Sequence, residues 1–311
     1  MTTDIRKSTL ELSHPRHIRS CRADRVVFVV NSVLLTLFLI AVLYPFLFII
    51  SCSFSSSNAL MSGKVTFYPV EFTLDGYIAI FGYRDIWTGF GNAFLYTVIG
   101  TVIGVILTIL AAYPLSRTSL KGRKPIMTLF LFTMLFNGGL VPNYMLIRSL
   151  GLINSMWAVI LPSALSAYNI IVARTFFITS IPAELHESAE LDGCGEFRFL
   201  LSIVIPLSKA IIAVLVLWIA IIYWNGYFNP MIYLNDKAKY PLQLILREIL
   251  LMAQVDFTKA ASNPEMYYKN KELSEILRYG TIIISSVPLM ILYPFIQKYF
   301  VQGVMIGSVK G

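Results

Sequence analysis

The 311-residue sequence has little charge and few cysteines. Asp, Glu, Lys and Arg make up 14% of the residues, hydrophobic residues make up 57%, and the mean hydropathy is +0.71. This composition is too apolar for a soluble domain of this size and indicates a polytopic membrane protein. The three cysteines, Cys21, Cys52 and Cys194, are widely spaced, so the sequence predicts neither a disulfide framework nor a metal site.

The motifs of nucleotide-binding and catalytic sites are missing as well. The sequence has no Gly-x4-Gly-Lys-Ser/Thr phosphate loop, no Gly-x-Gly-x-x-Gly turn and no His-Glu-x-x-His pair. His186 stands apart from the other two histidines and is expected to be a surface residue rather than a general base. We therefore expect neither an enzyme nor a cofactor.

Six apolar runs are long enough to cross a bilayer. About 30 Å of hydrocarbon needs roughly 20 helical residues. The runs cover residues 26–50, 92–115, 126–147, 156–178, 210–234 and 280–297. The first lacks a small-residue cleavage site and is expected to stay as an anchor rather than to be removed as a signal peptide. The predicted fold is all-α, with six transmembrane helices.

The distribution of Lys and Arg predicts the orientation. Residues 1–25 hold six of these cations and the short 117–125 loop holds four, whereas residues 51–91 hold two. Since short cytoplasmic segments carry the excess of positive charge, both termini are expected to face the cytoplasm. The predicted parts are a basic tail (1–25), a membrane domain (26–300) with a cytoplasmic loop at 181–206 and an external loop at 236–279, and a C-terminal tail (301–311). The net charge of +8 then reflects the Lys and Arg residues of the cytoplasmic segments. We therefore expect lipid contact and no nucleic-acid partner.

None of the six runs contains Asp or Glu. Ion-driven carriers and proton relays generally depend on carboxylates within the membrane. If this protein transports a solute, we expect the energy to come from elsewhere.

Several of the runs carry small or helix-breaking residues. Gly100 and Gly104 have the spacing that lets two helices pack closely. Breaks are predicted at 137–139 (Asn-Gly-Gly) and 224–226 (Trp-Asn-Gly), and such breaks are tolerated at membrane depth where they face protein or a water-filled cavity. Each break is therefore either part of a pathway wall or a kink that serves only helix packing. The 240–251 stretch predicts an amphipathic helix on the outer face.

The polar insert at 182–206 holds five of the seventeen carboxylates. Pro182 suits the first turn of a helix, and Gly193 suits a left-handed stop. The insert predicts a short acidic helix, a sharp turn and a second short helix at about 196–201. The alternative is an ordinary solvated loop.

The insert also contains a recognisable pattern. Glu187-Ser188-Ala189-x3-Gly193-x9-Ile203-x-Ile205-Pro206 resembles the EAA-x3-G-x9-I-x-L-P signature of the membrane subunits of bacterial ABC importers, with Ser188 in place of the first Ala and Ile205 in place of the Leu. The C-terminal end, Gly303-x3-Gly307-Ser308-Val309-Lys310-Gly311, is similar to that of maltose-type, MalG-like carbohydrate permeases. The 136–139 and 240–243 stretches resemble the polysaccharide-fragment branch with LplC-like and YtcP-like proteins.

The resemblance implies a multi-pass subunit of the bacterial plasma (inner) membrane. Its implied partners are a homologous sister permease, a cytoplasmic ABC ATPase dimer and an extracytoplasmic sugar-binding protein that contacts the 236–279 loop. The insert would then dock on the ATPase, with Glu187 engaging basic groups, Ala189 keeping one face small and Gly193 permitting the turn. The implied coupling residues are Glu184, Glu187, Ser188, Ala189, Asp192, Gly193, Ile203 and Pro206, and the implied tail contacts between the ATPase subunits are Gly307, Lys310 and Gly311.

Sugars are held by aromatic stacking and by amide hydrogen bonds. The candidate pathway residues are therefore those at the two breaks, namely Asn137, Tyr223, Trp224, Asn225, Tyr227 and Asn229. The resemblance also implies that the transport site can lie mainly in the sister permease, which would leave these residues to line a wall. The alternatives are a stand-alone carrier or channel for a small polar solute, and a membrane-embedded enzyme or signalling receptor.

Overall fold

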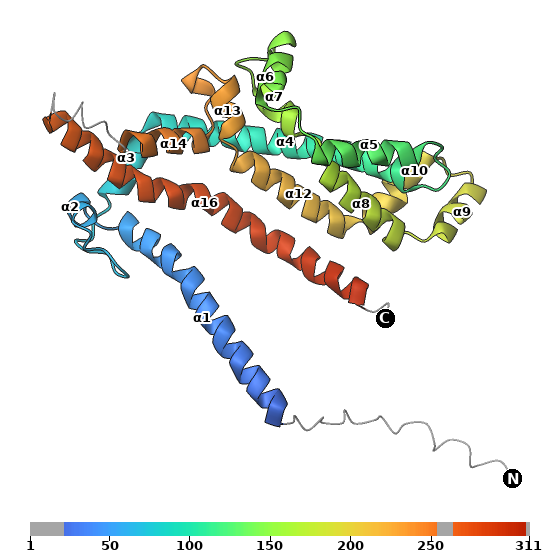
Figure 1. Ribbon diagram of the computed structural model, residues 1–311, viewed down its shortest axis with the longest axis horizontal. Coiled ribbons are helices and arrows are strands. Elements are labelled where there is room, and N and C mark those ends of the chain that lie inside the picture. The colour runs from blue at the N-terminus through green and yellow to red at the C-terminus, as the bar shows by residue number, and fades with distance from the viewer. Residues whose placement is uncertain (1–21, 254–263, 309–311) are drawn as a thin grey trace. The chain divides into compact units, whose positions relative to one another are not determined.

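The computed structural model describes residues 22–253 and 264–308. These residues are predominantly helical, and the only strand-like pairing among them is an isolated antiparallel bridge between Ser55 and Phe72. The expected all-α fold is therefore confirmed (Figure 1).

The chain divides into two compact units, residues 1–49 and residues 50–311. The described part of the first unit is a single helix, α1 (Arg22–Ser53), which runs on into the second unit and contains the predicted 26–50 span. Its apolar side chains are exposed around the whole helix, as those of Phe28, Leu35 and Phe38 illustrate. A helix that is apolar on all sides suits hydrocarbon or a protein interior rather than water.

The second unit contains the remaining helices. The first half of it is formed by α2 (Ser57–Met61), α3 (Asp75–Gly82), α4 (Arg84–Ser116), α5 (Arg123–Leu135), α6 (Leu140–Ser149), α7 (Met156–Ile160), the 3₁₀ turn η1 (Leu161–Ser163) and α8 (Ala167–Ser180). The second half is formed by α9 (Ala183–Leu191), α10 (Glu196–Phe199), the π-helical turn η2 (Leu200–Val204), α11 (Ile205–Leu207), α12 (Lys209–Trp224), α13 (Phe228–Tyr233), the 3₁₀ turn η3 (Lys237–Lys239), α14 (Leu242–Ala253) and α16 (Pro264–Ser308).

Three described helical segments are long and apolar enough to cross a membrane by themselves, namely residues 24–53, 84–116 and 277–294. The number reaches six if each of three bent helix pairs counts as one span. The bends are 114° between α5 and α6, 49° between α7–η1 and α8, and 83° between α10–α11 and α12. The six-span count remains a prediction.

The 126–147 and 210–234 spans are interrupted where breaks were predicted, and the 156–178 span is also interrupted, between Ser163 and Ala167, where none was predicted. The first is interrupted between Leu135 and Leu140, where Gly139 has φ +86° and its N–H donates to Asn137 Oδ1 at 2.9 Å. The second ends at Trp224. Both interruptions fall at the predicted breaks, and the first uses a positive φ at Gly139 that glycine adopts at little cost.

Helix α4 lies at the centre of the second unit and packs against α8, α12 and α14. A Cβ atom added to Gly100 would lie 2.5 Å from Tyr223 Cε2 of α12, and one added to Gly104 would lie 3.0 Å from the Ala164 carbonyl oxygen. The predicted packing role of these two glycines is confirmed.

Helix α14 is amphipathic as predicted, but its apolar face is buried within the protein. Leu242, Ile245 and Ile249 pack in a cluster with residues of α3, α4 and α16. At the other end of the chain, α16 continues to Ser308, so residues 301–308 of the expected tail prolong this helix.

Candidate functional site

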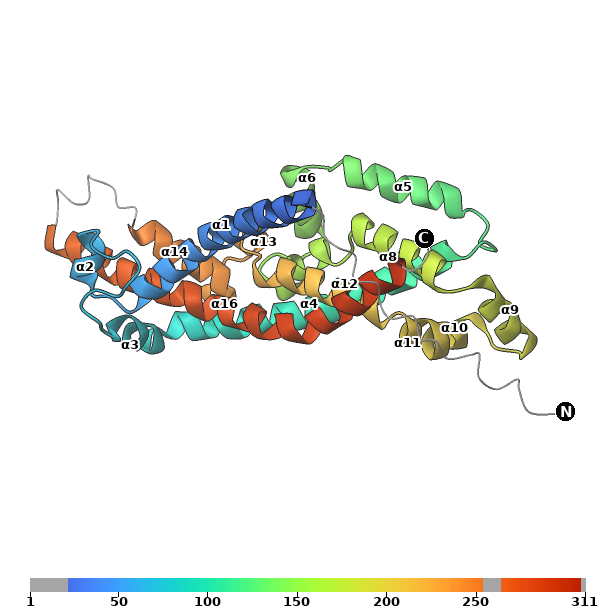
Figure 2. The same ribbon diagram turned by 90° about the horizontal axis from the view of Figure 1, so that it is seen from below.

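The segment from α9 to α11 lies at one end of the second unit, and α3 and α14 lie at the other (Figures 1 and 2). Helix α4 runs between the two ends. We call residues 181–207 the coupling loop, which lengthens the predicted 181–206 loop by one residue.

The ends of α9 are set by the residues that the sequence singled out. Pro182 occupies the N-cap with φ −59° and ψ 144° rather than the first helical turn. At the other end Gly193 has φ +71°, its N–H donates to the Glu190 carbonyl at 3.0 Å, and the Cys194 N–H donates to the Ala189 carbonyl at 2.9 Å. The bond from Cys194 to Ala189 is the six-to-one hydrogen bond of a Schellman motif, which ends the helix. The predicted left-handed stop at Gly193 is confirmed.

The second helix is longer than the predicted 196–201 segment. It starts at Glu196, widens into the π-helical turn η2 and ends at Leu207. Pro206 has no N–H to offer the carbonyl four residues before it, and the Ile205 N–H donates to Leu200 O, five residues back. The chain then bends at the buried Ser208 into α12.

The exposed surface of the coupling loop carries acidic side chains, and Leu191 and Phe197 are the most exposed of its large apolar side chains. Glu184, Glu187 and Asp192 are exposed. Leu191 is 90% exposed and Phe197 is 68% exposed. Sequence reasoning missed these two, although an exposed Leu and Phe in an otherwise polar insert are the signal that would have found them. We call these five residues the outer face.

The remaining predicted coupling residues lie in several environments. Ala189 is 8% exposed and packs in the chain's own core, and its expected role in seating the loop on a partner stays a prediction. Ile203 also packs partly on this core. Ser188 is exposed, and its hydroxyl donates to the Glu184 carbonyl at 2.9 Å. Gly193 and Pro206 are exposed.

His186 is not the surface residue that the sequence suggested. Its side chain is only 17% exposed, and its ring meets the Phe199 ring edge to face at a centroid distance of 5.0 Å. Since α9 has only nine residues, its apolar period is too short to show which side faces inward.

Three of the candidate pathway residues, Asn225, Tyr227 and Asn229, line a cavity of about 220 Å³. The Asn229 Nδ2 donates to Ser163 Oγ at 3.3 Å, which ties α13 to η1 across the cavity. The Arg247 guanidinium of α14 lies 5.9 Å from the centroid of the Tyr227 ring. The cavity thus combines amides, a hydroxyl and aromatic rings with a cation beside it, and sequence reasoning missed Ser163 and Arg247.

The other three candidate pathway residues are placed differently. Tyr223 contributes to the lining of the cavity, but it is buried and its hydroxyl donates to the Ile160 carbonyl at 2.8 Å. Trp224 is buried, and its Nε1 donates to the Ser285 carbonyl at 2.8 Å. Asn137 is exposed at the break between α5 and α6 and does not belong to the cavity lining.

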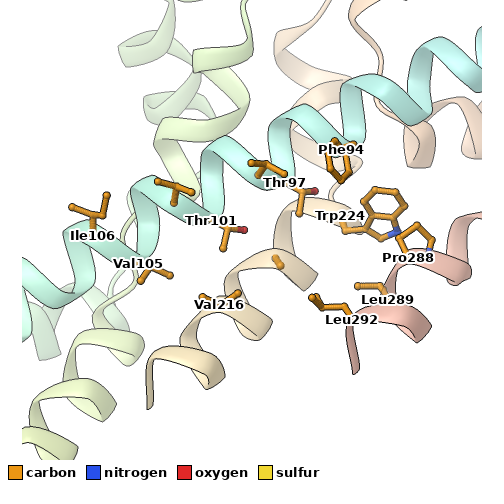
Figure 3. Close-up of a pocket in the computed structure, with 13 residues that line it drawn as sticks. Phe94, Thr97, Thr101, Val105, Ile106, Val216, Trp224, Pro288, Leu289 and Leu292 are labelled. Carbon is orange, nitrogen blue, oxygen red and sulfur yellow. The ribbon is translucent and has the colours of Figure 1, made fainter. Parts of the chain in front are cut away.

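A second cavity of about 460 Å³ lies between α4, α12 and α16, with Trp224 and Pro288 on one side (Figure 3). Its walls are almost entirely apolar. The hydroxyls of Thr97 and Thr101 are buried there without a hydrogen-bond partner among the described residues. A sugar would lose most of its hydrogen bonds in this cavity, so it suits apolar groups.

The predicted tail contacts are only partly described. Gly307 belongs to the last turn of α16, and Lys310 and Gly311 lie outside the described residues.

Comparisons with known proteins identify the family of the chain. Residues 104–262 match the family described as "Binding-protein-dependent transport system inner membrane component". The chain is 40% identical over 280 residues to the polygalacturonan/rhamnogalacturonan transport system permease protein YtcP of Bacillus subtilis (strain 168), covering 89% of this chain and 96% of that protein. It is 37% identical over 298 residues to protein LplC of the same organism, covering 96% and 99% of the two chains.

A solved structure resembles the fold closely. A chain from the crystal structure of a bacterial ABC transporter involved in the import of the acidic polysaccharide alginate matches with a TM-score of 0.80 and 34% identity, over 90% of this chain and 99% of that chain. The resemblance to ABC importer permeases found in the sequence is thereby confirmed. The chain belongs to the family of inner membrane components of binding-protein-dependent transport systems, as a permease of the ABC importer type.

Proposed function

We propose that this chain carries a sugar or oligosaccharide across the membrane while a separate ATPase subunit hydrolyses ATP. The single observation that carries the proposal is the exposed surface of the coupling loop. Its exposed acidic face, with Leu191 and Phe197 projecting, stands at one end of the unit that also contains the polar cavity at 225–229. A surface of this kind suits a basic, partly apolar cleft on a partner.

Membership of this family implies an ATPase and a substrate-binding protein as partners. We further propose a homologous sister permease, which the exposed apolar side chains of the described helices would contact together with lipid. Val98, Val102 and Ile106 on α4 are one such exposed group, and they also line the apolar cavity. Coupling would proceed as the ATPase dimer closes and displaces the coupling loops of the two permeases.

For the substrate, we propose an oligosaccharide that carries carboxylates. Two similar proteins are described in those terms, one as a polygalacturonan/rhamnogalacturonan permease and one as part of an importer of the acidic polysaccharide alginate. Within this chain, the Arg247 guanidinium beside Tyr227 supplies the charge that a uronate would seek. Asn225 and Asn229 supply amide groups for hydroxyls, and Tyr227 supplies a ring for stacking.

The coupling role is tested by reversing one charge on the outer face. We expect Glu187→Lys to prevent co-purification of the ATPase and to abolish uptake, because a cation would then face the basic groups of the partner. Membrane insertion of the variant should stay normal. Asp85→Lys, an exposed acid at the N-terminal end of α4, is the matched control and should retain the ATPase. Normal uptake and ATPase recovery with Glu187→Lys would refute the coupling assignment.

A further inference from the structure

A carboxylate of the coupling loop joins this loop to α4. The Tyr113 hydroxyl, near the C-terminal end of α4, donates a hydrogen bond to Glu196 Oε2. The other oxygen of the same carboxylate, Oε1, lies 3.0 Å from His186 Nε2 on α9. Glu196 therefore bridges three helices with one side chain. Tyr113 of α4 and Glu196 of α10 are 83 positions apart in the sequence.

Aromatic rings surround the bridge on its buried side. Phe199 is 1% exposed and receives the edge of the His186 ring. The Arg117 guanidinium, directly after α4, lies 5.6 Å from the centroid of the Phe199 ring and 5.9 Å from that of the Tyr113 ring. The end of α4 is held from a further side, because Arg174 Nε of α8 donates to the Leu115 carbonyl at 2.9 Å. The coupling loop is thus fastened to α4 through polar and apolar contacts together.

Helix α4 extends this connection toward the cavity. It is a single helix of 33 residues, with Tyr113 near its C-terminal end and Gly100 more than three turns before it. Gly100 lies against the Tyr223 ring, so closely that a Cβ atom would overlap that ring. Tyr223 in turn lines the cavity that Asn225, Tyr227 and Asn229 form. Helix α4 therefore contacts the coupling loop at Tyr113 and the cavity wall at Gly100.

We propose that Tyr113, Glu196 and His186 are positioning residues that convey the movement of the coupling loop to α4, and that α4 conveys it to the cavity wall at Tyr223. The proposal rests on the proposed function, since the loop must first dock on an ATPase. It adds that docking alone is insufficient. When the bridge is loosened, the loop moves with the ATPase and α4 follows incompletely.

The test compares docking with movement in the complete transporter. The complex of this chain with its sister permease and ATPase is reconstituted in proteoliposomes with the binding protein, and solute uptake is measured per ATP hydrolysed. Tyr113→Phe keeps the ring and removes the hydroxyl. We expect this ratio to fall about 2-fold to 30-fold, the range over which coupling mutations act, while the ATPase co-purifies in normal yield. Tyr168→Phe, which removes the hydroxyl of a half-exposed tyrosine on α8, should leave the ratio unchanged.

A double-mutant cycle separates positioning from general stability. Glu196→Ala removes the carboxylate that Tyr113 and His186 contact. The double variant Tyr113→Phe/Glu196→Ala should be no worse than the more impaired single variant, because both single changes remove the same bridge. His186→Phe, which keeps a ring against Phe199 but loses the contact with Glu196, should lower the same ratio.

An unchanged ratio in Tyr113→Phe, or additive losses in the cycle, would overturn the proposal. Loss of the ATPase from Tyr113→Phe would also overturn it, since Tyr113 would then support docking or folding rather than movement. These outcomes are distinct from a failure of the proposed function, which the Glu187→Lys variant reports by itself.

Discussion

At the scale of single residues, Glu196 is the most constrained carboxylate of the coupling loop. Burial raises its pKa, but the hydrogen bonds from Tyr113 and His186 outweigh this effect and the net pKa lies below the ordinary glutamate value. The other charged groups around it are Arg117 after α4 and Glu190 on α9, whose Oε2 lies 4.0 Å from His186 Nδ1. The ionised form is therefore the one that the folded loop favours.

A carboxyl group whose pKa is lower in the folded state stabilises the fold above its unfolded pKa, and this stabilisation is lost as the pH falls through the folded pKa. The ordinary glutamate pKa is about 4.3. We expect the melting temperature of the wild-type chain to exceed that of Glu196→Gln at pH 7 and the difference to shrink below about pH 4.5. A difference that stayed constant from pH 7 to pH 4 in detergent-solubilised protein would contradict this.

Recognition of the substrate's negative charge should depend on Arg247. We expect Arg247→Gln to reduce uptake of an oligogalacturonide by about tenfold, since a hydrogen bond to a charged group is worth roughly 1.5 kcal/mol or more. Uptake assays in cells that express the full transporter would measure this. Arg148→Gln on α6, where the arginine lies outside the cavity lining, is the control and should transport normally. Equal uptake by the two variants would remove Arg247 from the pathway.

At the scale of elements, the sharp end of α9 depends on one backbone conformation. A β-branched residue at φ +71° is strongly disfavoured. Gly193→Val should therefore misplace the start of α10 and abolish uptake while the chain still inserts in the membrane. Gly195 has φ −70° and ψ 156°, and a Cβ atom there would meet nothing within 4 Å. Gly195→Val should accordingly retain uptake, and equal behaviour of the two variants would argue against a structural stop at Gly193.

The contact between α4 and α12 gives a second matched pair. A Cβ atom at Gly100 would overlap the Tyr223 ring, whereas one at Gly91 on the same helix would meet nothing within 4 Å. We expect Gly100→Ala to destabilise the protein by about 1–3 kcal/mol through overpacking. Gly91→Ala should stabilise it by about 0.5–1 kcal/mol, because alanine favours helix more than glycine does. Thermal unfolding in one detergent measures both, and a stabilising Gly100→Ala would show that the helices can separate there without cost.

The sequence predicted those elements that depend on local chemistry. Gly193 as a stop, the interruption at Gly139 and the amphipathic helix, predicted at 240–251 and found at 242–253, all follow from residue types and their spacing. Features that depend on contacts between residues far apart in the sequence could not be predicted. Ala189 lies in one buried cluster with Tyr113 and Phe199, and the His186 ring packs on Phe199; no short-range pattern reports these contacts. The π-helical turn before Pro206 was not predicted either.

At the scale of the whole molecule, membership of the family implies that this chain works together with an ATPase and a substrate-binding protein. We expect gentle detergent extraction of the tagged chain from its own host to recover a second permease-like chain and an ATPase with a phosphate-binding motif, identified by mass spectrometry. An extracytoplasmic binding protein should join them when substrate is present. Recovery of this chain alone, active in liposomes without ATP, would favour a stand-alone carrier.

The thiol of Cys194 follows the turn at Gly193 and is partly exposed, whereas Cys52 is buried. With Cys21 replaced by serine, a maleimide fluorophore would label the chain mainly at Cys194. An ATPase seated on the neighbouring Leu191 would shield this thiol, so the labelling rate in the native membrane becomes an intrinsic gauge of how much of the transporter is assembled at any moment.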